Sequence, residues 1–329
     1  MALFNGRLLL AGSGLLLLAA LGVARLPLGQ LPQRLAAFRI SLNPPPAAGD
    51  RLSSADLSTW ADQWIVSAEA AARTIQGTDA VVLDPRTIAS SRLTRAVPIA
   101  WPAFSRDAVS RRGLLLSDDQ LLARKLEALG VSSDRPVLVA GDPKAWGEDG
   151  RIVWMLRTLG HPAAAMVDGG HSALAAALAA QNIRPAQPTS GSFAVQRDTT
   201  WSIGRDRLRE LMASSNVVVV DSRSAAEYAG GTPHGEARGG HVPGAVHLHF
   251  KSLMDEAGYL LPRPTLLDRL AQAGITSDKT IVTYCTGGVR SAWLAVVLTD
   301  LGFSVKNYAG SMWEWSAADP AQYPLVQTN

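Results

Sequence analysis

The chain repeats its own sequence once, with the second copy displaced by 137 to 144 residues. The matching segments occur in the same order in both copies, and the displacement drifts as it would where loops differ in length. This pattern predicts a duplicated domain and not a short-period repeat. The clearest matches are Trp64 with Trp201, Asp84-Pro85-Arg86 with Asp221-Ser222-Arg223, Val137-Leu138-Val139-Ala140 with Ile281-Val282-Thr283-Tyr284, and Leu159-Gly160 with Leu301-Gly302.

Each copy alternates short, β-branched apolar runs with segments of helical periodicity, such as 205–212, 265–273 and 289–301. Continuous apolar strands separated by helices are typical of a parallel sheet covered on both faces. The sequence therefore predicts the α/β class, with two tandem domains of about five strands each. A length of 329 residues agrees with two domains. In such sheets ligands bind beyond the carboxyl ends of the strands.

Composition excludes several classes of protein. Hydrophobic residues make up 47% and charged residues 18%, which is enough apolar surface for folded cores. The net charge of +3 gives no reason to expect a nucleic-acid partner. The single cysteine, Cys285, excludes an intrachain disulfide and a cysteine-cluster zinc site.

The amino-terminal region predicts export or anchoring. Residues 8–24 are uncharged and mostly apolar, and Gly22-Val23-Ala24 offers a signal-peptidase site. We expect a signal peptide or membrane anchor at 1–28, a Pro-rich linker at 29–57, a first domain at 58–182, a linker at 183–199 and a second domain at 200–329. The folded domains would then lie in the periplasm or be tethered to the membrane facing outward. Arg25, Arg34 and Arg39 after the apolar run oppose this orientation.

Cys285 stands where an apolar strand ends and a helix begins. Gly287 and Gly288 let the backbone N–H groups point inward as an anion-binding nest. The helix amino terminus adds partial positive charge, and Arg290 adds a full one. All three features favour the thiolate, which is the nucleophilic form. A buried structural cysteine beside an ordinary turn is the alternative.

The segment Cys285-Thr286-Gly287-Gly288-Val289-Arg290-Ser291 resembles the active-site loop of the rhodanese superfamily. The two-copy layout is similar to that of the tandem thiosulfate and 3-mercaptopyruvate sulfurtransferases. The other matching segments are Val219-Val220-Asp221-Ser222-Arg223 with Glu227-Tyr228, Gly240-His241-Val242-Pro243-Gly244-Ala245, and Tyr308-Ala309-Gly310-Ser311-Met312-Trp313-Glu314-Trp315, in which Met312 replaces the usual aromatic residue.

The resemblance implies two rhodanese-like domains, of which only the second is active. The first copy resembles the family's amino-terminal domain at Arg151-Ile152-Val153-Trp154 and Val167-Asp168-Gly169-Gly170, but Gly141 occupies the cysteine position. A glycine cannot carry sulfur, so we expect this domain to be catalytically silent.

The implied reaction is covalent sulfur transfer. Cys285 takes a sulfane sulfur from a small anionic donor and passes it, as a persulfide, to cyanide or a thiol, with no cofactor and no metal. The predicted catalytic residues are Cys285 and Arg290. The predicted substrate-binding residues are Thr286, Gly287, Gly288, Val289, Ser291 and Arg238.

Two alternatives remain open. Related phosphatases have five residues between the cysteine and the arginine, whereas this loop has four, a tighter cradle that favours sulfur over phosphate. A persulfide carrier that binds a partner protein would retain the same loop. Glu227 stands where mercaptopyruvate-type relatives have a second carboxylate-binding arginine, which favours thiosulfate as donor.

Several other residues carry no predicted chemistry. His247 and His249 alternate on a strand, a pattern more often structural than metal-binding. His241, Asp221 and Arg223 are expected to make structural polar contacts. Trp313 and Trp315 are expected to pack near the site.

Overall fold

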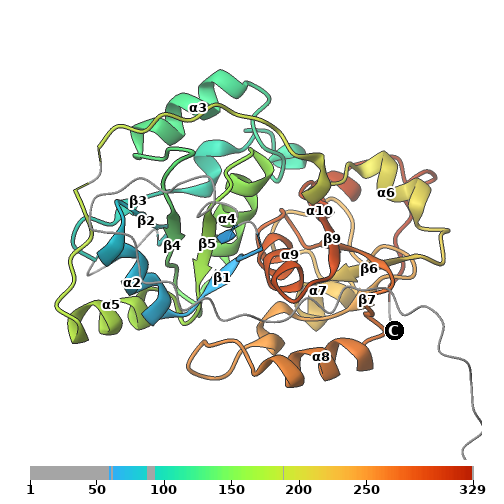
Figure 1. The fold of residues 1–329 in the computed structure, drawn as a ribbon. Coiled ribbons are helices and arrows are strands. Elements are labelled where there is room, and N and C mark those ends of the chain that lie inside the picture. Colours follow the sequence, from blue (N-terminus) through green and yellow to red (C-terminus); the bar gives the residue numbers. More distant parts are fainter. Residues whose placement is uncertain (1–58, 61, 87–92, 188, 328–329) are drawn as a thin grey trace, which may run out of the picture. The chain divides into compact units, whose positions relative to one another are not determined.

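The computed structural model describes residues 59–327 apart from 61, 87–92 and 188, all within the compact unit Pro44–Asn329 (Figure 1). The apolar segment 8–24 and the Pro-rich linker lie outside the described residues, so export and anchoring stay predictions. Within the described part of the chain, no helix combines the length and apolar character needed to cross a membrane.

The first half is built on a five-stranded parallel sheet in the order β1-β5-β4-β2-β3. Its first helix begins at Ser67, whose hydroxyl accepts a hydrogen bond from the N–H of Ala70, and it buries Ala71, Ala72 and Ile75. The elements are β1 (Ile65–Val66), α2 (Ala68–Gly77), β2 (Val81–Asp84), β3 (Val97–Pro98), α3 (Asp119–Ala128), β4 (Val137–Val139), α4 (Glu148–Thr158), β5 (Ala164–Val167) and α5 (Gly170–Ala180).

The second half has a four-stranded parallel sheet in the order β7-β6-β8-β9. A single parallel bridge between Ser202 and Asn307 stands where a fifth strand would pair with β9. The elements are α6 (Arg205–Leu211), β6 (Val217–Asp221), α7 (Ala225–Ala229), β7 (Val246–His247), α8 (Arg263–Gln272), β8 (Thr280–Tyr284), α9 (Arg290–Asp300), β9 (Ser304–Asn307) and α10 (Ser311–Trp315). The predicted α/β class with two parallel sheets is confirmed.

The duplication extends to individual side-chain contacts. In the first half, the carboxylate of Asp84 at the end of β2 binds Arg86 at 2.9 Å. In the second half, Asp221 at the end of β6 binds Arg223 at 2.7 Å, with both side chains fully buried. The equivalent pairs lie at the exit of equivalent strands, as expected for structural polar contacts.

The two halves meet where α4 packs against α9. The helices approach closely because Gly150 has no side chain: a Cβ there would lie 2.4 Å from the Cα of Trp293. The carboxylate of Asp300, at the end of α9, accepts hydrogen bonds from the N–H groups of Trp64 and Ile65 at 3.1 and 3.0 Å. The first half is thus joined to the helix that follows the cysteine loop.

We predict that Gly150→Ala destabilises the protein. In an open helix this change would stabilise by about 1 kcal/mol. Here the new methyl group would meet backbone atoms that cannot rotate away, and overpacking of this kind costs roughly 1–3 kcal/mol. Urea unfolding measures the effect. The control is Gly204→Ala, where a Cβ would have nothing within 4 Å. Equal free energies of unfolding for the two variants would contradict the close contact.

Candidate active site

Cys285 lies immediately after β8, at the carboxyl end of the second sheet, with a side chain only 1% exposed. Its N–H donates to the hydroxyl of Ser311 at 3.1 Å, and its carbonyl accepts from the N–H of Met312. Gly288 adopts a φ of +78°, and its N–H donates to the Cys285 sulfur at 3.1 Å. The backbone therefore curls around the sulfur as the glycines predict.

Opposing effects act on the Cys285 thiol. Burial raises its pKa, whereas the charge of Arg290 and hydrogen bonds from Ser291 and from the backbone of Gly287 lower it. The lowering effects prevail, so the pKa of Cys285 falls below its ordinary value. A lowered thiol pKa raises the fraction of nucleophilic thiolate at neutral pH.

Arg290 is bound by a carboxylate. Its two terminal nitrogens donate to the two oxygens of Glu227, each at 2.7 Å, and both side chains are buried. Burial alone would raise the pKa of Glu227, but the hydrogen bonds and charge of Arg290 hold it well below its usual range. The charge that we expect from Arg290 is therefore shared with Glu227, and it still lowers the pKa of Cys285.

Thr286 links this pair to a second buried carboxylate. Its hydroxyl oxygen accepts from Arg290 at 2.7 Å and lies 3.0 Å from Glu227 and 2.9 Å from Glu236. Two carboxylates thus meet at the Thr286 hydroxyl, next to the cysteine loop.

The silent half contributes a second buried cation, Arg151 of α4, which is 1% exposed. Its guanidinium donates to the carbonyls of Gly113 at 2.7 Å and of Gly288, in the cysteine loop, at 3.3 Å. Among the described residues, no carboxylate lies within ion-pair distance of it. Burial lowers the pKa of Arg151 to about 10 while the charge of Cys285 opposes the fall, so Arg151 remains protonated at neutral pH.

A cavity of about 170 Å³ opens in front of Cys285, with walls from both halves. Trp146, from the silent half, is 51% exposed and lies with its ring 5.1 Å from the Arg290 guanidinium and 5.4 Å from the His234 ring. The lining residues are Trp101, Trp146, Glu148, His234, Cys285, Thr286, Gly287, Val289, Arg290 and Trp313.

The structure brings most of the predicted site residues together. Thr286, Gly287, Val289 and Arg290 line the cavity beside Cys285. Gly288 and Ser291 do not line it, but each contributes a hydrogen bond to the sulfur.

Arg238 is not among the residues that line the cavity, which corrects its predicted substrate-binding role. Its guanidinium donates to four carbonyl oxygens of the carboxyl-terminal segment at 2.8 to 3.2 Å. These bonds, made by Nε and Nη2, hold the guanidinium against the backbone of the carboxyl-terminal segment and not at the cavity. The acceptors belong to Trp315, Ser316, Ala318 and Tyr323.

The histidines and Trp315 make structural contacts. Nε2 of His247 is hydrogen-bonded to the carbonyl of Arg223 at 2.8 Å, and His241 stacks on Tyr228 with the ring centroids 3.6 Å apart. The described part of the chain holds no group of three potential metal-ligating side chains. Trp315 is fully buried, whereas Trp313 reaches the cavity.

Sequence reasoning missed four contributors: the pair of carboxylates Glu227 and Glu236, the wall residue Trp146, and the cation Arg151. The position of Arg151, directly before the apolar run 152–156, is the one signal that could have singled it out. Glu227 lies on α7, whereas Glu236 and Trp146 lie in loops, and the sequence does not specify how these segments meet Cys285.

In the silent half, a carboxylate occupies the space beside the position that corresponds to the cysteine. A Cβ at Gly141 would lie 2.9 Å from the side chain of Asp149. Asp149 accepts a hydrogen bond from the N–H of Gly150 at 2.8 Å. Burial, together with the charges of Glu148 and Asp142, raises the pKa of Asp149 to about 7.

We predict that Asp149→Asn stabilises the protein above neutral pH. The folded-state pKa is raised from 3.8 to about 7, so the stability of the wild type is lost as pH rises through this interval. Asparagine keeps the oxygen acceptor and carries no charge, and a shift of this size corresponds to on the order of 4 kcal/mol at pH 8. Urea unfolding between pH 4 and pH 8 measures it.

The matched control for this experiment is Asp107→Asn, at an exposed position. The gain from Asp149→Asn should shrink towards zero as the pH falls to 4, and the control should show no comparable pH-dependent gain. A gain that is independent of pH would contradict the raised pKa.

Known proteins resemble this chain in both sequence and fold. A family model for the rhodanese-like domain matches residues 205–318. The thiosulfate sulfurtransferase of Pseudomonas aeruginosa is 34% identical over 194 residues, covering 58% of this chain and 71% of that protein. That of Azotobacter vinelandii is also 34% identical, over 58% of this chain and 72% of its own length.

A plant relative and one solved structure extend the comparison. The mitochondrial thiosulfate/3-mercaptopyruvate sulfurtransferase 1 of Arabidopsis thaliana is 29% identical, covering 69% of this chain and 67% of that protein. The crystal structure of the 3-mercaptopyruvate sulfotransferase SseA from Escherichia coli shares the fold, with a TM-score of 0.62 and 22% identity over 76% of this chain and 98% of that one. The chain therefore belongs to the tandem rhodanese-like thiosulfate/3-mercaptopyruvate sulfurtransferase family.

Proposed function

We propose that this sulfurtransferase moves the sulfane sulfur of thiosulfate to a thiophilic acceptor, cyanide or a thiol, through a persulfide on Cys285. The observation that carries the proposal is the position of the Cys285 sulfur, held by the N–H of Gly288 at 3.1 Å within a loop that borders a cavity. Its lowered pKa provides the thiolate that the reaction needs.

The chemistry balances without a cofactor. The thiolate of Cys285 attacks the outer sulfur of thiosulfate, a new S–S bond forms, and sulfite leaves with the electron pair of the bond that breaks. The acceptor then attacks the terminal sulfur of the persulfide and restores the thiolate. The N–H groups that point at the sulfur stabilise the negative charge that it carries before and after each step.

The hydrogen bonds of Arg290 argue against a phosphatase, and those of Arg238 argue against 3-mercaptopyruvate as the donor. A phosphatase needs its loop arginine to bind two phosphate oxygens, but both terminal nitrogens of Arg290 are engaged by Glu227. A 3-mercaptopyruvate site needs a cation for the substrate carboxylate, and Arg238 is engaged by carbonyls outside the cavity. Thiosulfate, which has no carboxylate, is therefore the favoured donor.

We predict that Cys285→Ser abolishes thiocyanate formation from thiosulfate and cyanide, because a hydroxyl is a poor nucleophile and cannot hold the persulfide. Wild-type protein should show a higher kcat/KM with thiosulfate than with 3-mercaptopyruvate. The control is Asp142→Ala in the loop of the silent half, which should retain activity. A single stoichiometric persulfide without turnover would favour a carrier, and preference for 3-mercaptopyruvate would reverse the choice of donor.

We further propose that Arg151 adds to the positive charge that stabilises the buried thiolate, beside Arg290, whose charge is partly offset by Glu227. Arg151→Met should raise the pKa of Cys285, which the pH dependence of alkylation by iodoacetamide measures. Arg151→Lys keeps the charge and should restore most of the shift. A purely structural Arg151 would change the melting temperature but leave the alkylation profile of the folded protein unchanged.

A further inference from the structure

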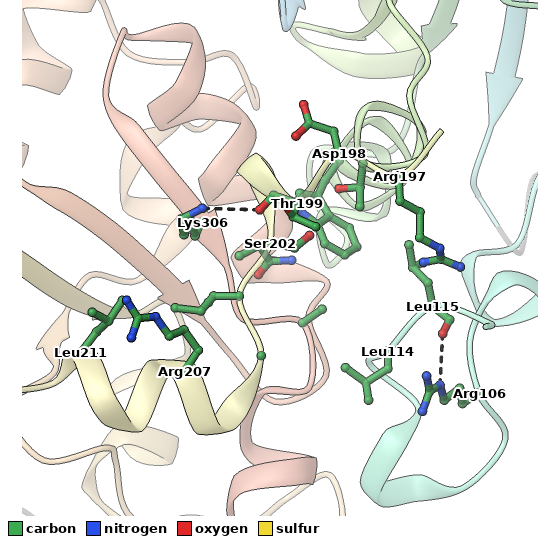
Figure 2. Close-up of a pocket in the computed structure, with 16 residues that line it drawn as sticks. Arg106, Leu114, Leu115, Arg197, Asp198, Thr199, Ser202, Arg207, Leu211 and Lys306 are labelled. Carbon is green, nitrogen blue, oxygen red and sulfur yellow. Dashed lines mark hydrogen bonds between the residues drawn. The ribbon is translucent and has the colours of Figure 1, made fainter. Parts of the chain in front are cut away.

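A second and larger cavity, of about 550 Å³, lies between the two halves and does not include the cysteine loop in its walls (Figure 2). We call it the interdomain cleft. Its walls come from the first half, from the segment 183–199 that connects the halves, and from the second half. The lining residues are Arg106, Leu114, Leu115, Trp154, Thr158, Arg197, Asp198, Thr199, Ser202, Ile203, Gly204, Arg207, Leu211, Lys306, Asn307 and Ala309.

Positive charge faces this cleft from both sides. Arg106 of the first half donates to the carbonyl of Leu115 at 3.2 Å, and Lys306 of β9 donates to the carbonyl of Thr199 at 3.4 Å (Figure 2). Lys306 also donates to the carbonyl of Thr200 at 2.9 Å. Within the described part of the chain, neither cation has a carboxylate within ion-pair distance. A carbonyl oxygen does not neutralise a charge, so both cations keep their attraction for an anion.

The other charged residues that line the cleft do not cancel the positive charge of Arg106 and Lys306. Arg197 pairs with Asp119 at 2.6 Å, and Arg207 pairs with Glu210 at 2.7 Å, both at exposed positions where ion pairs are weak. The lining carboxylate, Asp198, accepts a hydrogen bond from the N–H of Thr200 at 2.8 Å.

Three polar side-chain atoms buried in the wall have no hydrogen-bond partner among the described residues: Oγ1 of Thr158, Oγ of Ser202 and Nδ2 of Asn307. Thr158 is 6% exposed and Asn307 is 0% exposed. The other amide atom of Asn307, Oδ1, accepts from the hydroxyl of Ser291 at 2.7 Å. A buried polar group without a partner destabilises the folded protein, and a hydrogen bond to a ligand oxygen would offset that cost.

The rest of the wall is apolar. Leu114 and Leu115 lie on the opposite side of the cleft from Leu211 (Figure 2), and Ile203 and the ring of Trp154 add further apolar surface. The volume lies in the range of small-molecule sites, which combine apolar walls with a few convergent polar groups. An inorganic anion would leave these walls without contacts, and a neutral apolar molecule would leave the cations and the buried polar atoms unpaired.

We propose that the interdomain cleft binds a small organic anion, a carboxylate or sulfonate carried on an apolar body. The anionic group lies beside one of the two cations, which stand on opposite sides of the cleft (Figure 2), and the apolar body lies against the leucine side chains. This site is separate from the Cys285 cavity and does not depend on the identity of the sulfur donor.

The test is a calorimetric titration of the full chain with 2-naphthalenesulfonate, with naphthalene-2-sulfonamide as its neutral counterpart. We expect saturable binding of the sulfonate that weakens as salt increases, and at least tenfold weaker binding of the sulfonamide. Arg106→Gln and Lys306→Gln keep a donor for the carbonyls but lose the charge, and the variant that removes the cation beside the sulfonate should weaken binding about tenfold. The matched control is Arg209→Gln on α6, because Arg209 does not line the cleft.

A further variant tests the buried polar atoms. Thr158→Val preserves the shape of the side chain and removes only the unpartnered hydroxyl, so the melting temperature should not fall while binding weakens about fivefold. Equal affinities for the sulfonate and the sulfonamide would overturn the proposal. So would an affinity in both Arg106→Gln and Lys306→Gln that equals that of Arg209→Gln. An unchanged affinity in Thr158→Val would contradict a direct contact between the ligand and the buried hydroxyl of Thr158.

Cys285→Ser separates this site from the sulfur-transfer site. The variant should bind 2-naphthalenesulfonate as wild type does, and thiosulfate should not displace the probe. Loss of binding in this variant, or displacement by thiosulfate, would place the probe in the Cys285 cavity and overturn the proposal.

Discussion

A buried thiolate needs positive charge nearby, and the arrangement of the two halves around Cys285 follows from that need. The loop arginine is tied to Glu227 by two hydrogen bonds of 2.7 Å, so it offers the sulfur a shared charge. The backbone N–H of Gly288 supplies a fixed dipole, and Arg151 brings an unpaired cation to the other side of the same loop. The electrostatics of the site thus depend on both domains, although the reactive sulfur belongs to one.

Duplication explains why the silent domain can place a charged residue beside the cysteine loop. Both halves retain the same strand order and the same Asp–Arg pair at the exit of a central strand. They differ in the loop that follows β4 or β8. In one loop a cysteine sulfur accepts backbone hydrogen bonds, and in the other Asp149 fills the space beside Gly141. A buried carboxylate cannot transfer sulfur, but its helix α4 carries Arg151 and, through Gly150, packs directly on α9.

The seam between the halves holds two cavities of different character. The one at Cys285 is small and walled by tryptophans, a histidine and the cysteine loop. The other is larger, with cations on both sides and apolar walls. Hydrogen bonds connect the two cavities. Asn307 of the interdomain cleft accepts a hydrogen bond from the hydroxyl of Ser291, and the backbone of Ser291 is hydrogen-bonded to the Cys285 sulfur. The seam is therefore where both domains contribute chemistry that neither holds alone.

The sequence by itself determined the α/β class, the duplication, the position of Cys285 after a strand and the absence of a thiol from the first half. These follow from local patterns: apolar runs, turn glycines and residue identity. Only the tertiary structure decided which charges meet. Glu227 lies 63 positions before Arg290, and Arg238 lies 78 positions before the carbonyl of Ser316 that it binds. Arg151 comes from the other domain. Ion pairs and orphaned charges depend on distances of a few ångströms between segments far apart in the chain, and no periodicity in the sequence encodes them.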